Sequence, residues 1–285
     1  MTKQEYHQRI IDYYRQTENA YKDSWDLNRS LAIHYGYWDN QVHSFPQSLQ
    51  RMNEVMMEEA GILEGDRVLD AGCGVGGSSV FLAAVLNCRV TGITLSERQV
   101  EQARVNAQSR KVDDKAEFRV MDYAQTDFPD QSFDIVWGCE SICYAHDKEK
   151  FIREAFRLLK PGGRLVVADG FVSSFENNQH PEIRQWLDGW EVNYLESPER
   201  FNGFLQSAGF SHIRYRDISR EAGRSSKRLY RFYFLASAYL VWKKINFSGP
   251  PTDMQKRNIK ACLYQYKGLR QGLWQYGLFA AQKPG

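Results

Sequence analysis

The stretch that decides the fold lies at residues 68–77 and reads VLDAGCGVGG. Residues that suit a buried strand run into glycines at positions 72, 74 and 76, and we expect a helix to start near Ser78. Glycine lets the backbone turn tightly and, having no Cβ, lets a ligand lie against the main chain. The free N–H groups of the first helical turn face such a ligand. The pattern therefore predicts a ligand-binding turn between a strand and a helix.

Two kinds of ligand suit these glycines. Gly72, Gly74 and Gly77 also fit the G-x-G-x-x-G pattern of dinucleotide sites. Asp70 argues against a dinucleotide, because its carboxylate would repel a pyrophosphate but suits the ammonium group of an amino acid. About 20 residues further on, a dinucleotide site has an acidic residue for the ribose, whereas this chain reads VTGITLS at 90–96. We therefore expect the cofactor to be S-adenosylmethionine, a zwitterionic sulfonium, and not NAD.

Strand and helix signals alternate from residue 67 onward, which predicts a parallel sheet with helices on both faces. Strands are expected at 67–70, 89–93, 116–120, 133–138, 163–169, 212–218 and 277–282, and helices at 4–28, 46–60, 78–85, 96–109, 148–159 and 198–208. We expect one domain over 1–285, with 1–55 as an N-terminal helical lid, 56–170 as the cofactor-binding α/β core, 171–197 and 221–272 as cap insertions, and 198–220 and 273–285 as the rest of the core. Residues 171–197 show no regular pattern.

Composition indicates a soluble globular protein, with 42% hydrophobic and 25% charged residues. The five cysteines are odd in number and lack paired metal-ligand spacing, so we expect a reduced, cytoplasmic protein without a metal site. The polar start carries no apolar signal core. The longest apolar run, at 232–242, is too short to span a bilayer.

Charge is distributed unevenly along the chain. From Ser211 onward there are 15 Lys or Arg and 3 Asp or Glu. This imbalance favours a basic face that meets an anionic partner or a membrane surface, and the alternative is an ordinary solvated surface. The chain has no N/D-P-P-Y/F motif and no recognisable RNA-binding module, so nucleic acid is not expected as a partner.

The ends of successive strands supply the candidate cofactor ligands, because ligands of an open α/β sheet bind beyond the carboxyl ends of its strands. Thr94 and Gln99 can reach ribose hydroxyls. Asp122 can accept a hydrogen bond from the adenine amino group while Tyr123 stacks on the ring. Cys139 lies at the next strand end. For Thr94 and Tyr123, packing in the core is the alternative role.

These residues carry a family resemblance. The run 68–77, with Asp122, Tyr123 and 133–138, resembles the class I S-adenosylmethionine-dependent methyltransferases over about residues 55–170. Residues 92–96, Gln99 and Glu140 are similar to gamma-tocopherol methyltransferase and the cyclopropane fatty acid synthases, with sterol methyltransferases more distant because they have asparagines in place of Thr94 and Leu95. The resemblance implies a Rossmann-like fold with a seven-stranded, mostly parallel sheet and a helical cap. It also implies that residues 35–39, which begin with Tyr35, form a lid segment that contacts the methionine part of the cofactor.

The chain departs from its relatives around the catalytic strand. Of the glutamate, histidine and tyrosine that surround a bicarbonate in cyclopropane synthases, only the glutamate maps clearly onto this chain, at Glu140. The glutamate–histidine pair of the tocopherol group is spaced differently, since the nearest histidine is His146. The resemblance therefore identifies the cofactor more closely than the substrate.

A methyl transfer to carbon needs a base, and Glu140 is the first candidate. Binding the cofactor or capping a helix is the alternative for Glu140. His146 is the second candidate, although a loop histidine is often a bystander. We expect a lipophilic acceptor such as a prenylated phenol, terpenoid, polyketide or alkaloid, with C-methylation favoured. The alternatives are a cyclopropane-synthase-like or non-methylating relative, or, last, a nucleic-acid methyltransferase. Substrate contacts are expected from Trp38, Trp190 and Tyr233, with Arg228 at an anionic head; ordinary core packing or solvent exposure is the alternative.

Overall fold

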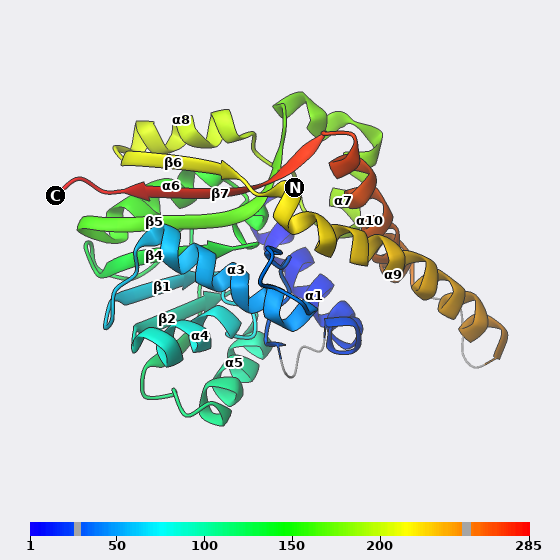
Figure 1. Cartoon of the computed structure of the whole chain (residues 1–285), viewed down its shortest axis with the longest axis horizontal. Coiled ribbons are helices and arrows are strands. Elements are labelled where there is room, and N and C mark those ends of the chain that lie inside the picture. Colours follow the sequence, from blue (N-terminus) through cyan, green and yellow to red (C-terminus); the bar gives the residue numbers. More distant parts are fainter. Residues whose placement is uncertain (26–29, 247–251) are drawn as a thin grey trace.

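The computed structural model describes residues 1–25, 30–246 and 252–285. A seven-stranded sheet with the order β3-β2-β1-β4-β5-β7-β6 forms its centre (Figure 1). The strands are β1 (Arg67–Ala71), β2 (Arg89–Thr94), β3 (Ala116–Val120), β4 (Phe133–Cys139), β5 (Leu159–Val172), β6 (Ser211–Asp217) and β7 (Trp274–Gln282). β1 to β5 pair in parallel, and β7 runs antiparallel to β5 and β6. The predicted Rossmann-like, mostly parallel sheet is confirmed.

Helices cover both faces of this sheet. They are α1 (Lys3–Trp25), α3 (Phe45–Ala60), α4 (Gly77–Leu86), α5 (Glu97–Ser109), α6 (Lys148–Leu158), α7 (Pro181–Gly189), α8 (Pro198–Ala208), α9 (Ser219–Asn246) and α10 (Asp253–Arg270), with short 3-10 helices η1 (Ile142–Tyr144) and η2 (Phe175–Gln179). In the central strands, side chains alternate between two apolar clusters, as a sheet covered on both sides requires. Val68 and Ile135 pack in the cluster that includes α3, α4 and α5, whereas Leu69 and Val136 pack in the one that includes α6 and α8.

The strand order places the binding crevice. The chain builds the sheet outward from β1 to β3 on one side and from β4 on the other, so the order reverses between β1 and β4. These two strands pair in parallel, with Asp70 opposite Trp137. In an open α/β sheet the ligand binds beyond the carboxyl ends of the strands at this point. The glycine turn after β1 and residues 140–141 after β4 therefore meet at one edge.

The segment 171–197 is not irregular throughout, because it contains α7. Pro181 occupies the first turn of this helix, and the His180 side chain accepts a hydrogen bond from the Glu182 N–H. Trp186 and Leu187 are buried. A Cβ at Gly189 would lie 2.5 Å from the Arg257 carbonyl oxygen, so α7 and α10 are in close contact. A helix of this length depends on tertiary packing, which the local sequence does not reveal.

Two boundaries also differ from expectation. Helix α6 ends at Leu158, as the following Lys-Pro-Gly-Gly sequence suggests, but β5 begins at once at Leu159. The pairing of β4 with β5 shifts register between Phe133 and Ile135, so the residues expected between helix and strand form an irregularity near the start of β5. Of the predicted N-terminal helix at 4–28, residues 26–28 lie outside the described part of the chain.

The predicted 221–272 insertion is built around two long helices. α9 runs away from the sheet beside α10, as Figure 1 shows. α10 packs closely on α7. Within the described part of the chain, no helix combines the length and the apolar character needed to cross a bilayer.

Candidate active site

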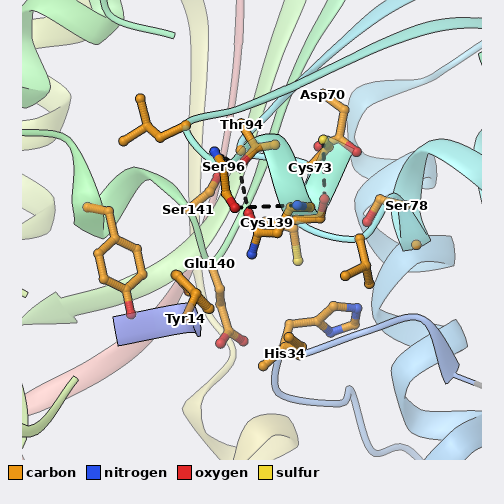
Figure 2. Close-up of a pocket in the computed structure, with 18 of the residues that line it drawn as sticks. Tyr14, His34, Asp70, Cys73, Ser78, Thr94, Ser96, Cys139, Glu140 and Ser141 are labelled. Carbon is orange, nitrogen blue, oxygen red and sulfur yellow. Dashed lines mark hydrogen bonds between the residues drawn. The ribbon is translucent and has the colours of Figure 1, made fainter. Parts of the chain in front are cut away.

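A first pocket, here called the cofactor pocket, lies at the carboxyl edge of the sheet. Strand ends form its inner wall, with Asp70 from β1, Thr94 from β2 and Cys139 from β4. Leu31 to His34 and three residues of α1, namely Ile10, Ile11 and Tyr14, close the other side. In Figure 2, Asp70 and Thr94 lie on one side of the pocket, and Tyr14, Glu140 and His34 lie on the opposite side.

Glycines shape the turn after β1. Gly72 has φ +92°, and a Cβ there would lie 2.4 Å from the Ser141 Cβ, so the β1 and β4 loops can meet only without a side chain. Gly74 has φ +52° and lines the pocket, and a Cβ there would meet no protein atom within 4 Å. The space beside Gly74 is therefore open to a ligand.

Asp70 carries the acidic group that separated the two cofactor hypotheses. It is buried, and its carboxylate accepts a hydrogen bond of 2.6 Å from the Ser79 hydroxyl. Burial raises its pKa to about 6. A carboxyl group in this position suits a cationic ligand, because a bound positive charge favours its ionised form.

Of the four residues predicted to bind the ribose and the adenine, three line the cofactor pocket and Asp122 does not. Thr94, Gln99 and Tyr123 line the cofactor pocket. The Thr94 hydroxyl donates to Gln99 Oε1 over 2.6 Å, so Gln99 uses its side-chain oxygen here and not in a full capping box with Ser96. The Tyr123 hydroxyl donates to the Ser141 carbonyl oxygen over 2.7 Å.

Asp122 does not line the cofactor pocket. Its Oδ2 accepts a hydrogen bond of 2.8 Å from Lys3 Nζ, and its Oδ1 accepts one from the Ala124 N–H. The lysine comes from α1, an element far away in the sequence. The Asp122 carboxylate is thus paired with α1 in this structure, and its contact with the adenine amino group stays a prediction.

Glu140 lies where the cofactor pocket meets a second pocket, here called the acceptor pocket. Its φ is +48°, a strained value for a side chain with a Cβ, and it follows the end of β4. Its Oε1 accepts hydrogen bonds from the Tyr35 N–H and from the Tyr276 hydroxyl, the latter over 2.6 Å. Burial raises its pKa to about 8.

The acceptor pocket is largely apolar. Trp186, Trp190 and Trp274 line it together with Leu229 and Phe232 of α9. Glu140 and Asp169 are the acidic side chains among its described lining residues, which include no lysine, arginine or histidine. The pocket therefore suits a lipophilic molecule that reacts near a carboxyl group.

Asp169 is a site residue that the sequence analysis missed. Its two carboxylate oxygens accept hydrogen bonds of 2.8 Å from the Cys143 and Gly170 N–H groups. Burial raises its pKa to about 6. It lies on β5, two strands from β1, so the same strand-end argument that selected Asp70 and Asp122 could have found it.

The remaining predicted site residues are dispersed. Tyr35 lines the acceptor pocket and not the cofactor pocket, and Trp190 lines the acceptor pocket. His146 lines neither pocket, and its ring lies 6.0 Å from that of Tyr6. Tyr233 does not line the acceptor pocket, whereas its neighbour Phe232 does.

Trp38 and Arg228 line a third hollow, here called the basic groove. Its lining residues are Trp38, Phe45, Arg224, Lys227, Arg228, Arg231, Phe232 and Leu235. The Arg228 guanidinium lies 4.0 Å from the centre of the Phe45 ring. Phe232 also lines the acceptor pocket, so the groove and that pocket are neighbours that share this residue.

The cofactor pocket fits S-adenosylmethionine on three counts. The open space at Gly74 accepts a ligand against the backbone. Asp70 places an anionic side chain in the pocket, and the Thr94–Gln99 pair places polar groups at the next strand end. The fold and this pocket together define a class I methyltransferase.

Comparison with known proteins agrees. A family model described as a methyltransferase domain matches residues 69–167. The 27-O-demethylrifamycin SV methyltransferase of Amycolatopsis mediterranei is 37% identical over 202 residues, which cover 70% of this chain and 74% of that protein. The chloroplastic tocopherol O-methyltransferase of Arabidopsis thaliana is 27% identical over 96% of this chain and 82% of that protein.

A solved structure extends the likeness in fold to the whole chain. Geranyl diphosphate C-methyltransferase from Streptomyces coelicolor A3(2), in complex with Mg²⁺, geranyl diphosphate and S-adenosyl-L-homocysteine, superposes with a TM-score of 0.73 at 23% identity and covers 98% of this chain and 97% of that one. This chain belongs to the S-adenosylmethionine-dependent methyltransferases, in the group that includes the tocopherol and sterol enzymes. It is an enzyme, and S-adenosylmethionine is its cofactor.

Proposed function

We propose that the enzyme methylates a lipophilic small molecule, such as a prenylated phenol, terpenoid, polyketide or alkaloid, that lies in the acceptor pocket. The observation that carries this proposal is the position of Glu140, which lines both pockets. Tyr14, Ile33 and Tyr144 are also shared by the two pockets. These four residues form the junction through which an acceptor atom would approach the cofactor.

The protein contributes alignment and the exclusion of water. When bound, S-adenosylmethionine supplies a methyl group that its sulfonium already makes electrophilic. Tyr14 and Ile33 come from the N-terminal segments that close the site, so these segments keep water from the junction. Holding two reactants in line in a water-excluded site lowers the barrier without a covalent intermediate.

We assign the role of general base to Glu140. The Tyr35 N–H and the Tyr276 hydroxyl both donate to Oε1, which holds the carboxyl group in one orientation. Burial favours the neutral acid, and a positive charge bound beside the group favours the carboxylate that can take a proton. A carbon acceptor needs such a base, so C-methylation remains the favoured outcome, although the two relatives described above are named for methylation at oxygen.

The experiment is an assay of Glu140→Gln beside the wild-type enzyme, with radiolabelled S-adenosylmethionine and a panel of phenols, prenylated compounds, polyketides and alkaloids. We expect the variant to bind cofactor within a few-fold of wild type and to lose about 100-fold or more in turnover, the scale of a lost general base. Turnover near that of wild type would show that Glu140 has no role as a base.

The same panel tests the alternative reaction types. Mass spectrometry and NMR of the product identify the methylated atom. A product that has gained a ring and no methyl group would favour a cyclopropane-synthase-like or non-methylating relative. Fatty acyl lipids belong in the panel for this reason.

We further propose that the basic groove and the outer face of α9 meet an anionic amphiphile, either the acceptor's own head group or the lipid of a membrane surface. Phe234, Leu235 and Tyr239 are exposed, with Leu235 at 72%. Arg224, Lys227 and Arg231 lie on the same helix. An apolar stretch beside cations is typical of a segment that rests at a lipid interface.

A further inference from the structure

One buried polar atom at the cofactor pocket has no partner. His34 belongs to the segment between α1 and α3, is 6% exposed and lines the cofactor pocket. Its Nε2 is buried and makes no hydrogen bond within the described residues. Figure 2 shows the His34 ring on the side of the pocket near Ser78, away from Thr94.

The chemistry of Nε2 follows from the contact of the other ring nitrogen. Nδ1 lies 2.9 Å from the carbonyl oxygen of Tyr35. A carbonyl oxygen can only accept, so Nδ1 carries the proton and donates. Burial lowers the pKa of the imidazole, which keeps the ring neutral. In the neutral ring Nε2 then has no proton and is a hydrogen-bond acceptor.

The hydroxyl labelled on the His34 side of the pocket in Figure 2, that of Ser78, is already used. Ser78 donates its hydroxyl hydrogen bond to Asn53 Oδ1 over 2.9 Å. A buried acceptor left without a donor is destabilising, and such a group in a native site commonly marks the place of a ligand donor. The donor is therefore expected from the molecule that fills the pocket.

S-adenosylmethionine carries such a donor in its amino-acid part. The Thr94–Gln99 pair marks the ribose end of the pocket, and His34 lies away from it, beside the glycine turn where Asp70 provides a carboxylate. We propose that His34 Nε2 accepts a hydrogen bond from the α-ammonium group of S-adenosylmethionine. This inference rests on the cofactor pocket assigned above. It adds His34 as a cofactor-binding residue, which neither the glycine motif nor the strand-end argument selects.

Calorimetry with two ligands tests the proposal. S-adenosylhomocysteine contains the amino-acid part, whereas 5′-methylthioadenosine lacks it. His34→Phe keeps a ring but removes the acceptor, and we expect it to weaken S-adenosylhomocysteine binding by about tenfold or more, as for a lost hydrogen bond to a charged group. Binding of 5′-methylthioadenosine should stay within twofold. His43→Phe, at an exposed histidine nearby, is the matched control.

The outcomes separate this proposal from the assignment of the pocket. Equal weakening of both ligands, or weakening of neither, would overturn the role of His34. Failure of the wild-type protein to bind either ligand would instead contradict the cofactor pocket itself.

A measurement on the wild-type protein covers the case in which the variant fails to fold. In ¹⁵N NMR, the Nε2 resonance of His34 should shift upfield on addition of S-adenosylhomocysteine, as expected when an unprotonated nitrogen gains a hydrogen bond, and should stay in place with 5′-methylthioadenosine. An unchanged resonance with both ligands would overturn the proposal.

Discussion

Gly74 and Gly65 form a natural pair for a test at the scale of single residues. Both have positive φ, +52° and +80°, and a Cβ at either would meet no protein atom within 4 Å. A valine at either position therefore carries a similar backbone strain, about 1–2 kcal/mol. The difference is that Gly74 lines the cofactor pocket and Gly65 does not.

We expect Gly74→Val to abolish binding of S-adenosylhomocysteine, because the branched side chain would occupy the space of the ligand. Gly65→Val should lose comparable stability but keep its affinity within twofold. Isothermal calorimetry on both variants, with melting curves to compare their stability, gives the result. Similar affinities in the two variants would mean that the space at Gly74 is not used by the cofactor.

Glu140 also predicts how stability depends on pH. Its pKa rises from 4.5 to about 8 on folding, because burial disfavours the charged form. The folded protein therefore binds a proton that the unfolded chain has released between these values. The stability contributed by this proton is complete below about pH 4.5 and is lost as the pH rises through about 8.

Replacing the carboxyl group removes this titration. The free energy of unfolding of Glu140→Gln, relative to wild type, should therefore increase as the pH is raised from about 4.5 to about 8. Urea unfolding at several pH values measures it, and Glu64→Gln, at an exposed glutamate, is the control. A relative stability that does not change with pH would contradict the burial of a titrating Glu140.

At the scale of elements, α1 and α9 each contribute residues to a pocket and also carry charged side chains outside it. α1 carries Tyr14, which lines both pockets, and its Arg9 and Lys3 pair with Glu191 and Asp122 on the body of the protein. α9 supplies Leu229 and Phe232 to the acceptor pocket and presents arginines to the basic groove. A change in the position of either helix would therefore alter the lining of the acceptor pocket.

The outer face of α9 is tested by sedimentation with lipid vesicles. We expect the protein to sediment with vesicles that contain anionic lipid and to be released by added salt, because exposed charges are screened beyond about 10 Å at 0.1 M. Lys227→Glu with Arg231→Glu should reduce this binding. Arg89→Glu, an exposed charge reversal on β2, should not.

The basic groove gives a different result if it holds the acceptor itself. Arg228→Glu would then raise the KM for an anionic acceptor and leave vesicle binding unchanged. If the charge reversals change neither vesicle binding nor KM, the groove is a solvated surface and both roles are excluded.

At the scale of the whole molecule, ligand binding should appear as stabilisation. S-adenosylhomocysteine at 100 times its Kd is expected to add about 2.7 kcal/mol to the free energy of unfolding. The melting temperature should rise by several degrees, whereas NAD at the same concentration should cause no shift. Differential scanning calorimetry measures both. A shift with NAD and none with S-adenosylhomocysteine would contradict the interpretation that Asp70 favours S-adenosylmethionine over a dinucleotide.

Local pattern was sufficient for most of the fold. The bounds of β3 at 116–120 and of α8 at 198–208 agree with the sequence prediction, because each element has its own start and stop signals. α7 was missed, since its stability comes from contact with α10, about 70 residues further along the chain. Strand β5 was predicted too short at both ends for a related reason. Pairing with β4 extends its start to Leu159, and pairing with β7 extends its end to Val172.

The sequence by itself determined the class of cofactor, because Asp70, the glycines and the helix start are neighbours in the chain and form one continuous motif. The junction of the two pockets at Glu140 depended on tertiary structure. Tyr35 and Tyr276, both donors to Glu140, are 105 and 136 residues away from it in the chain. The positions of Asp169 and His34 likewise depend on folding. The strand order brings Asp169 to the acceptor pocket, and the packing of the segment after α1 brings His34 to the cofactor pocket. Hydrogen bonds between such distant residues leave no periodic pattern in the sequence, so only the folded chain reveals them.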